Sequence, residues 1–259
     1  MKKNFHHNLI VLGAGLTGMV LALRLAKENI KVCLVEKRKS NTKNLDRRTT
    51  AVSKGSSIIL KKIGAWSEIE KNAQKIERIV VSEGVSDQNL EFDPKSEDYD
   101  SMGYIIDNSI FKRALEKLIK KNSNILVESN CDVENLDLPS RINRNRVVLQ
   151  SKEKTLSCDL LLAADGRFSK TRFHAEVKYF YHDYKQSAYV FNIRHEKSHQ
   201  STALERFFPT GPLAILPMKS YKNKQSSVVW TVENIHGDLL KLSPNQFLNE
   251  FNKRYDNFF

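Results

Sequence analysis

The sequence predicts an α/β fold in which a parallel sheet with covering helices is followed by, or carries as an insertion, a mainly antiparallel sheet. Short apolar runs alternate with helical apolar spacing up to about residue 186, as in a chain that crosses repeatedly over a parallel sheet. From residue 187 strand patterns follow one another without helices between them, which is typical of antiparallel pairing. We therefore expect two domains, residues 1–186 with small antiparallel excursions and residues 187–259.

The chain opens with a strand, a glycine-rich turn and a helix. Residues 9–12 are continuously apolar, and Gly13, Gly15 and Gly18 separate them from a helical pattern. The first glycine allows a tight turn, the second allows a pyrophosphate to approach the backbone, and the third allows close packing of helix on strand. Glu36 ends the next predicted strand, where an acidic side chain accepts hydrogen bonds from ribose hydroxyls. This combination predicts a Rossmann-like dinucleotide site, with phosphates at the helix N-terminus.

The middle of the chain continues the alternation of predicted strands and helices. Ser53 is predicted to cap a helix that Gly64 ends. Asp107 or Asn108 opens a second helix with strong apolar periodicity. The predicted strands here cover residues 31–36, 79–82, 89–92, 125–127 and 146–149.

A second glycine-containing corner lies far along the chain. Residues 160–164 form an apolar run that is predicted to be a buried parallel strand. Asp165 and Gly166 follow this strand directly. An Asp-Gly pair also favours ordinary turns, so a plain strand-to-loop turn is the alternative interpretation. Ser169 and Arg172 follow, and the family resemblance described below implies that their spacing favours a ligand site. Together the two corners narrow the predicted dinucleotide to FAD.

The second domain is predicted to contain strands and one helix. The strands cover residues 188–193, 203–208, 213–216 and 226–232. The helix begins with the capping-box pattern of Ser243 and Gln246.

Composition favours a cytoplasmic protein, with peripheral contact at the inner membrane as a further expectation. Lys and Arg number 42 against 30 Asp and Glu, a net charge of +12, but the excess is dispersed, so nucleic acid is not an expected partner. No apolar run approaches the roughly 20 residues of a membrane span. Cys33, Cys131 and Cys158 are scattered and fit reduced, mostly buried thiols.

The histidines do not form a recognisable site. His195 and His199 flank a polar stretch that is predicted to be a solvated loop rather than a metal site. No arrangement of Ser, His and Asp or of Cys and His is convincing, so no catalytic residue is assigned.

Several motifs in order give the chain a family resemblance. The sequence resembles the FAD-dependent aromatic-ring hydroxylases with the para-hydroxybenzoate hydroxylase fold and, more narrowly, the ubiquinone-biosynthesis hydroxylases. The matching stretches are residues 13–18, 46–53, 103–108, 164–172, 211–217 and 228–231. The Gly-Pro-Leu-Ala stretch beginning at Gly211 is the most specific to the ubiquinone branch.

This resemblance implies a monooxygenase that uses FAD, with NAD(P)H as reductant, to hydroxylate a polyprenyl phenol, a phenolic quinone precursor. It implies that Glu36 holds the adenosine ribose and that Arg48 contacts the flavin side of FAD or its phosphates. Asp165 and Gly166 are expected beside the ribityl and pyrophosphate region, and Val133 is expected to offer backbone contacts to adenine. For Arg48 the alternative is a surface charge beside Arg47.

In that family the antiparallel sheet covers the substrate cavity, so the resemblance implies the same position for the sheet of the second domain. Arg206 and Tyr189 are polar candidates near it. Strand alternation is expected to decide which apolar candidates face the cavity and which are core, namely Phe207, Phe208, Leu213, Ile215 and Trp230.

The sequence departs from the family at its end. It reaches Phe259 without the later Gly-Asp or Gly-Asn segment that continues into Ala-Ala-His and grips the flavin. We expect either that a complementing C-terminal chain or other ubiquinone-biosynthesis proteins complete the site, or that the chain is a truncated, non-catalytic remnant or scaffold with a partial ADP-binding lobe. An NAD-dependent dehydrogenase ranks last. Phe258 and Phe259 are expected to be exposed.

Overall fold

The computed structural model divides into two compact units, each of which is built from several stretches of the chain. It describes residues 3–39, 46–86, 88–94, 100–139, 146–236, 238–256 and 258. The first unit comprises Met1–Leu45, Ile59–Glu68 and Ser109–Phe180, and the second comprises Asp46–Ile58, Ile69–Asn108 and Tyr181–Phe259.

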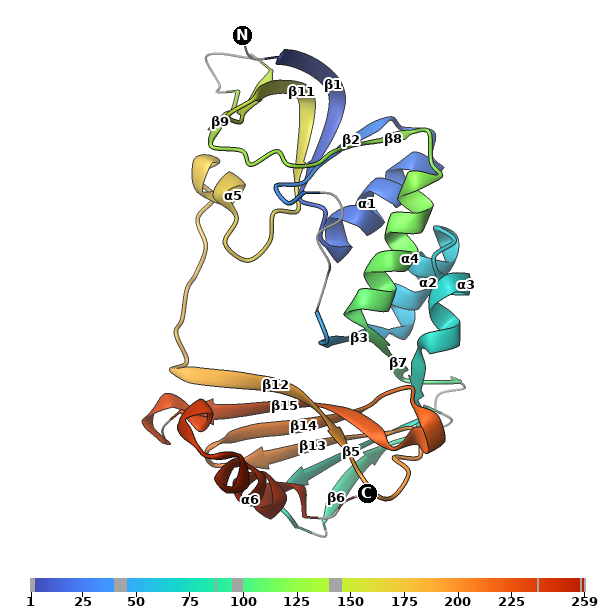
Figure 1. Cartoon of the computed structure of the whole chain (residues 1–259), viewed down its shortest axis with the longest axis vertical. Coiled ribbons are helices and arrows are strands. Elements are labelled where there is room, and N and C mark those ends of the chain that lie inside the picture. Colours follow the sequence, from blue (N-terminus) through green and yellow to red (C-terminus); the bar gives the residue numbers. More distant parts are fainter. Residues whose placement is uncertain are drawn as a thin grey trace. The chain divides into compact units, whose positions relative to one another are not determined.

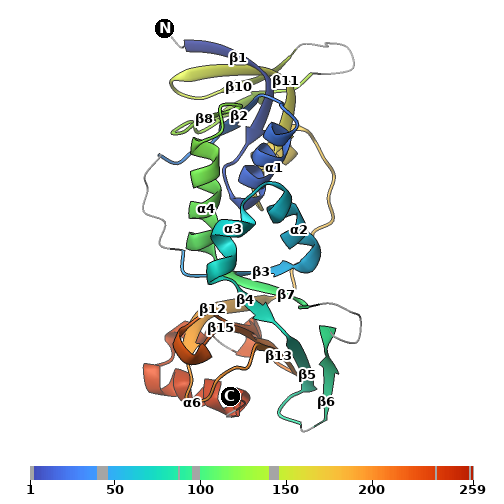
Figure 2. The same ribbon diagram turned by 90° about the vertical axis from the view of Figure 1, so that its right-hand side faces the viewer.

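The first unit contains a six-stranded sheet in the order β8-β2-β1-β11-β10-β9 (Figures 1 and 2). The strands β8, β2, β1 and β11 are parallel, while β10 pairs antiparallel with β11 and β9. The strand bounds are Lys3–Leu12 (β1), Val32–Val35 (β2), Ile125–Glu128 (β8), Asn135–Asp137 (β9), Val147–Gln150 (β10) and Lys154–Ala163 (β11).

Two amphipathic helices lie side by side next to this sheet in both views (Figures 1 and 2). Helix α1 (Leu16–Lys27) buries Met19 and Leu23, and α4 (Asn108–Lys120) buries Phe111 and Leu115. The helical spacing of these apolar residues gives each helix one buried face. Helix α5 (Lys170–His174) follows the second glycine-containing corner.

The three cysteines are free and buried in the first unit, as predicted. They belong to one apolar core with Ile10 and Leu156. Burial raises the pKa of Cys33 to about 12 and that of Cys158 to about 11. These thiols are therefore core residues and poor nucleophiles at neutral pH.

The second unit contains a six-stranded sheet and a three-stranded sheet. The larger sheet has the order β12-β15-β14-β13-β5-β6 and is antiparallel except between β5 and β13, and the smaller has the order β3-β7-β4. Bounds are Thr49–Ser53 (β3), Gln74–Ile76 (β4), Arg78–Glu83 (β5), Asn89–Phe92 (β6), Gly103–Asp107 (β7), Gln186–Arg194 (β12), Thr202–Phe208 (β13), Gly211–Pro217 (β14) and Gln225–Glu233 (β15).

The predicted helix caps are present. The Ser53 hydroxyl accepts from the N–H of Ser56 at 3.2 Å at the start of α2 (Lys54–Lys62), and Gly64 follows it with φ +80°. The short helix α3 (Trp66–Ile69) comes next. Helix α6 (Pro244–Tyr255) begins with the expected capping box of Ser243 and Gln246.

Helix α6 covers one face of the larger sheet. Phe251 and Tyr255 pack in a core with Trp230, Leu213 and Ile215. Phe258 also packs against this core, so its predicted exposure is wrong, because the Arg206 guanidinium lies 5.6 Å from its ring. Phe259 lies outside the described residues.

Three further expectations differ from the structure. Residues 46–58, 69–108 and 181–186 of the expected 1–186 domain belong to the second unit, and residues 78–92 do so because β5 pairs with β13 in the larger sheet. Leu160, expected in a buried strand, is 51% exposed, although it pairs with Leu9 of β1. His199 is fully buried rather than solvated, because its ring bonds the Met218 carbonyl and the N–H of Ser201.

Candidate dinucleotide site

The two glycine-containing corners lie against each other in the first unit. Strands β1 and β11 are paired neighbours, and the N–H of Ala164 donates to the Leu12 carbonyl at 2.8 Å. A Cβ atom on Gly13 would lie 2.4 Å from the Ala164 carbonyl oxygen and 3.0 Å from Cα of Asp165. Gly13 also has φ +105°, a conformation that other residues rarely adopt. The backbone alone therefore requires glycine where the two corners meet.

The other two glycines of the first corner differ in their surroundings. A Cβ on Gly18 would lie 1.8 Å from the Gly13 carbonyl oxygen, so Gly18 allows α1 to pack on the turn. A Cβ on Gly15 would have no heavy atom within 4 Å. Gly15 is the N-cap of α1 and provides no side chain to accept hydrogen bonds from the first helical turn. The turn therefore leaves open space and unsatisfied donors where a phosphate would bind.

Glu36 lies directly after β2 and faces the same turn. One of its carboxylate oxygens accepts from the N–H of Ala14 at 2.9 Å, and the other accepts from the N–H of Arg38 at 3.0 Å. These two bonds fix the side chain beside the glycine turn. Each carboxylate oxygen can accept more than one hydrogen bond, so Glu36 keeps capacity for ribose hydroxyls.

Asp165 is held by its own loop. Its carboxylate accepts from the hydroxyl of Ser169 at 2.7 Å, and from the N–H and hydroxyl of Thr171, both at 3.1 Å. Burial alone would raise the pKa of Asp165, but these hydrogen bonds outweigh it and hold the pKa below its usual value. Gly166 follows with φ +90°, and a Cβ atom added to it would have no heavy atom within 4 Å. The corner thus stays open beside an ordered carboxylate.

Val133 lies in the same unit and packs at the edge of the core that contains the cysteines. Its carbonyl accepts from Nζ of Lys170 at 3.3 Å, and that lysine also lies 3.6 Å from Asp132. The backbone of Val133 is thus linked to the helix that follows the Asp165 loop.

Arg48 belongs to the second unit. Its guanidinium donates two bonds of 2.8 Å to Asp46, a bidentate pair that holds the pKa of the Asp46 carboxyl far below its usual range. Asn108 also donates to Asp46 at 3.2 Å. The first unit therefore contains seven of the eight predicted site residues, and Arg48 is held in the second unit by Asp46. Those seven are Gly13, Gly15, Gly18, Glu36, Val133, Asp165 and Gly166.

The residues predicted to line a substrate cavity lie on two different faces of the larger sheet. Leu213, Ile215 and Trp230 point toward α6 and are core, as strand alternation allowed, and Phe208 packs at the edge of that core. Phe207 alternates to the opposite face and is 53% exposed. The two polar candidates both lie on the face of the sheet that α6 covers. Arg206 donates to the carbonyls of Arg254 and Tyr255 at 2.8 and 3.3 Å, and Tyr189 bonds Asp238.

Two further features are absent from the described residues. Among them, no group of three or more His, Cys, Asp or Glu side chains is arranged to hold a metal ion. None of the helices in the described ranges has both the length and the apolar character needed to span a membrane.

Comparison with known sequences gives relatives that agree with the predicted family. The chain matches the family of the FAD binding domain over residues 7–252. It is 30% identical over 226 residues to the ubiquinone hydroxylase UbiM of Neisseria meningitidis, covering 84% of this chain and 48% of that protein. It is also 30% identical over 264 residues to the mitochondrial ubiquinone biosynthesis monooxygenase COQ6 of Drosophila melanogaster, covering 96% and 54%. The chain thus spans about half the length of these relatives.

Solved structures confirm the predicted fold class. The p-nitrophenol 4-monooxygenase PnpA from Pseudomonas putida matches with a TM-score of 0.76 and 16% identity, covering 98% of this chain and 63% of that chain. PqsL from P. aeruginosa, in complex with 2-aminobenzoylacetate, matches with a TM-score of 0.77 and 15% identity, covering 96% and 67%. At such low identity these similarities concern the fold alone.

Proposed function

The chain belongs to the FAD binding domain family, and on this premise we propose that it binds the ADP portion of FAD at the paired glycine corners. The observation that carries the proposal is the meeting of Gly13 with Ala164 and Asp165, while Gly15 stays open. The pyrophosphate would lie at the N-terminus of α1, and Glu36 would accept from the ribose hydroxyls.

We further propose that this site serves a monooxygenase of ubiquinone biosynthesis that hydroxylates a polyprenyl phenol with NAD(P)H as reductant. The names of the relatives UbiM and COQ6 support this activity. When bound, FAD would supply the redox chemistry. The residues of this chain would bind and orient the cofactor, with the Asp165 loop ordered by Ser169 and Thr171.

A titration tests the cofactor proposal. Purified chain is titrated with FAD while flavin fluorescence is recorded, and ADP is then added as competitor. We expect saturable FAD binding that ADP reverses, because the described contacts concern the ADP portion. A folded chain that binds neither compound at millimolar concentration would contradict the proposal. Phenol-dependent consumption of NAD(P)H, with a product one oxygen heavier by mass spectrometry, tests the reaction itself.

We propose that protein equivalent to the remaining length of the relatives completes the flavin site. The chain covers 48% and 54% of UbiM and COQ6, respectively. The 51% exposure of Leu160, on the strand that leads to Asp165, supports an additional covering segment. Such a segment would be part of the same polypeptide, a second polypeptide or another ubiquinone-biosynthesis protein.

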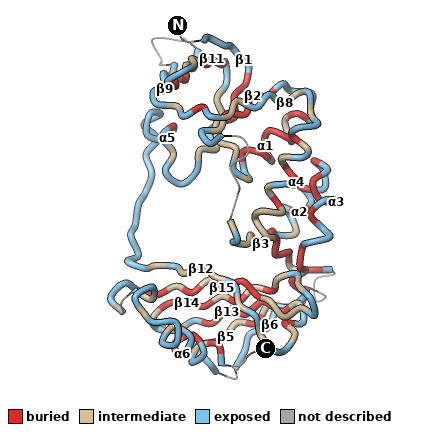
Figure 3. The backbone as a smooth tube through the Cα atoms, in the orientation of Figure 1, coloured by how far each residue is buried: buried red, intermediate tan, exposed pale blue. Residues whose placement is uncertain are grey.

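We also propose peripheral contact with an anionic membrane through the connection between α5 and β12. This connection is exposed along its length (Figure 3). Arg172 lies 4.6 Å over the ring of Tyr179, and the same stretch contains Lys178. Aromatic rings and basic side chains together suit the interface of an anionic bilayer. The aromatic residues at the end of α5 and in this connection are 66% to 90% exposed and comprise Phe173, Tyr179, Phe180, Tyr181 and Tyr184.

Vesicle sedimentation tests this contact. We expect binding to vesicles that contain anionic lipid and about tenfold weaker binding when Phe180 and Tyr181 are both replaced by serine, since two apolar anchors are lost. Ile235→Ser is a matched control, because Ile235 is 85% exposed but lies in another part of the chain. Equal binding by all three proteins would contradict the proposal.

A further inference from the structure

Glu205 is a carboxylate in an otherwise apolar part of the larger sheet. It lies in β13, where it pairs with Val81 of β5 and with Ala214 of β14. Its neighbours Leu204 and Arg206 point toward α6, so alternation places Glu205 on the opposite face. Sequence reasoning did not single it out, although one acidic residue in an apolar alternation is a usable signal.

The surroundings of Glu205 do not compensate its charge. Among the described residues, none forms a hydrogen bond or an ion pair with its carboxylate. Burial raises the pKa of Glu205. A partly buried carboxylate without a partner is unfavourable for folding, so its presence favours a role in binding.

The row of side chains that contains Glu205 is apolar on both sides. In register across the sheet, Val229 lies beyond Ala214, Val190 lies beyond Val229, and Leu90 lies beyond Val81. Val190 and Leu90 are 44% and 60% exposed. The row is therefore an accessible apolar strip with one acceptor near its middle.

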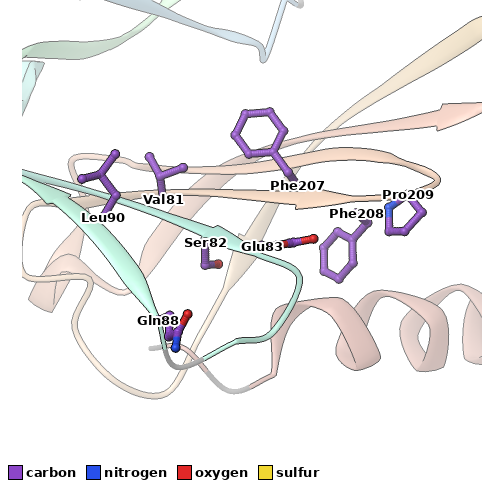
Figure 4. A pocket seen from close by; sticks show the side chains of 8 residues that line it. All are labelled: Val81, Ser82, Glu83, Gln88, Leu90, Phe207, Phe208 and Pro209. Atoms are coloured by element: carbon purple, nitrogen blue, oxygen red, sulfur yellow. The ribbon is translucent and has the colours of Figure 1, made fainter.

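A shallow groove of about 580 Å³ adjoins one end of this strip. Figure 4 shows Val81, Leu90 and Phe207 on the same side of the sheet, with Ser82 and Phe208 on the other side. Because Phe207 follows Glu205 by two residues in β13, its side chain lies on the same face.

We propose that Glu205 positions the phenolic substrate by accepting a hydrogen bond from its hydroxyl group, while the ring and its alkyl chain lie along the apolar strip. This inference rests on the proposed function and adds a residue and a contact to it. Glu205 acts as a positioning residue, and no bond is made or broken in this step.

The chemistry of the strip favours a neutral hydroxyl donor over a cation. A cation would lose its hydration against valine, alanine and leucine side chains and would gain one partner, whereas a phenol has a single O–H and is otherwise apolar. A hydrogen bond to a charged acceptor is stronger than one between neutral groups. The carboxylate can therefore favour a ligand that has a hydroxyl group over a similar ligand that lacks one.

The test compares a phenol with its methyl ether. Affinities of the full chain for 4-butylphenol and 4-butylanisole are measured by ligand-observed NMR titration. We expect the chain to prefer the phenol by about tenfold, which corresponds to loss of one hydrogen bond to a charged group. Glu205→Ala should abolish this preference and leave the affinity for the ether unchanged or higher. Glu205→Gln should retain part of it.

The control is Glu91→Gln, which removes an exposed carboxylate from β6 on the opposite face of the sheet and should leave the preference intact.

The Tm of Glu205→Gln should equal or exceed that of the unmodified chain. A lower Tm would indicate a structural role and overturn the inference. Equal affinity of the unmodified chain for phenol and ether would overturn it while leaving the proposed function in place. Failure to bind either compound would overturn both the inference and the proposed phenolic substrate.

Discussion

Gly13→Ala and Gly18→Ala are each expected to unfold the first unit or to destabilise it by more than about 4 kcal/mol, beyond the range of most point substitutions. The alanine Cβ would lie 2.4 Å from the Ala164 carbonyl oxygen in the first variant and 1.8 Å from the Gly13 carbonyl oxygen in the second. Both contacts are with backbone, so neither can be relieved by rotating a side chain. Gly13 additionally has φ +105°, where alanine is strained. Urea unfolding followed by circular dichroism, with hydrogen exchange of the β1 and β11 amides, measures the effect.

Gly15→Ala is the matched control within the same motif. Gly15 has φ −71° and ψ 178°, which alanine adopts readily, and its new Cβ would have no neighbour within 4 Å. We expect the free energy of unfolding to change by less than about 0.5 kcal/mol. The affinity for FAD should fall about tenfold or more, which is about 1.4 kcal/mol, because the methyl group occupies the space through which a pyrophosphate approaches. Tight FAD binding by Gly15→Ala would place the cofactor elsewhere.

Asp165→Ala is expected to lower the free energy of unfolding of the first unit by about 2–4 kcal/mol, since three hydrogen bonds to a carboxylate are lost. The donors are the Ser169 hydroxyl and both donors of Thr171. The Ser169 hydroxyl also caps α5 by accepting from the N–H of Arg172 at 2.9 Å. Loss of the carboxylate should therefore loosen the whole loop and weaken FAD binding as well. Thermal melting with and without FAD measures both effects.

The pH dependence of Asp165 follows from the direction of its pKa shift. The folded-state pKa lies below the unfolded value of about 3.9, so the carboxylate contributes its full stabilisation above that value. This contribution is lost as the pH falls through the folded-state pKa. Asp165→Ala should consequently be less acid-sensitive than the unmodified chain. Asp137→Ala is a control, because Asp137 is an exposed carboxylate of β9 in the first unit. An identical acid response of all three proteins would contradict this account.

The sequence predicted well those features that depend on local patterns. The helical spacing around Phe111, the capping box at Ser243 and the glycine spacing from Gly13 to Gly18 each correspond to the element expected. Glycine turns at the ends of adjacent parallel strands meet at one sheet edge, which is why both corners could be assigned to one site.

The features that sequence reasoning missed depend on partners far along the chain. Residues 78–83 read as a local strand, but pairing with Thr202–Phe208 decides which sheet they join. The apolar run at Leu160 predicted burial, yet burial depends on a covering element that a strand pattern does not specify. Arg206 and Glu205 differ by one position and lie on opposite faces, so strand register decides that one bonds α6 while the other stays without a partner among the described residues.

The two units are interlaced, because the chain passes from one to the other several times before it ends. During synthesis the β5–β6 hairpin leaves the ribosome more than a hundred residues before its partner β13 exists. Neither unit can therefore finish folding as an independent piece from a single continuous stretch. The nascent hairpin presents an unpaired edge during that interval, and unpaired strand edges are prone to aggregation.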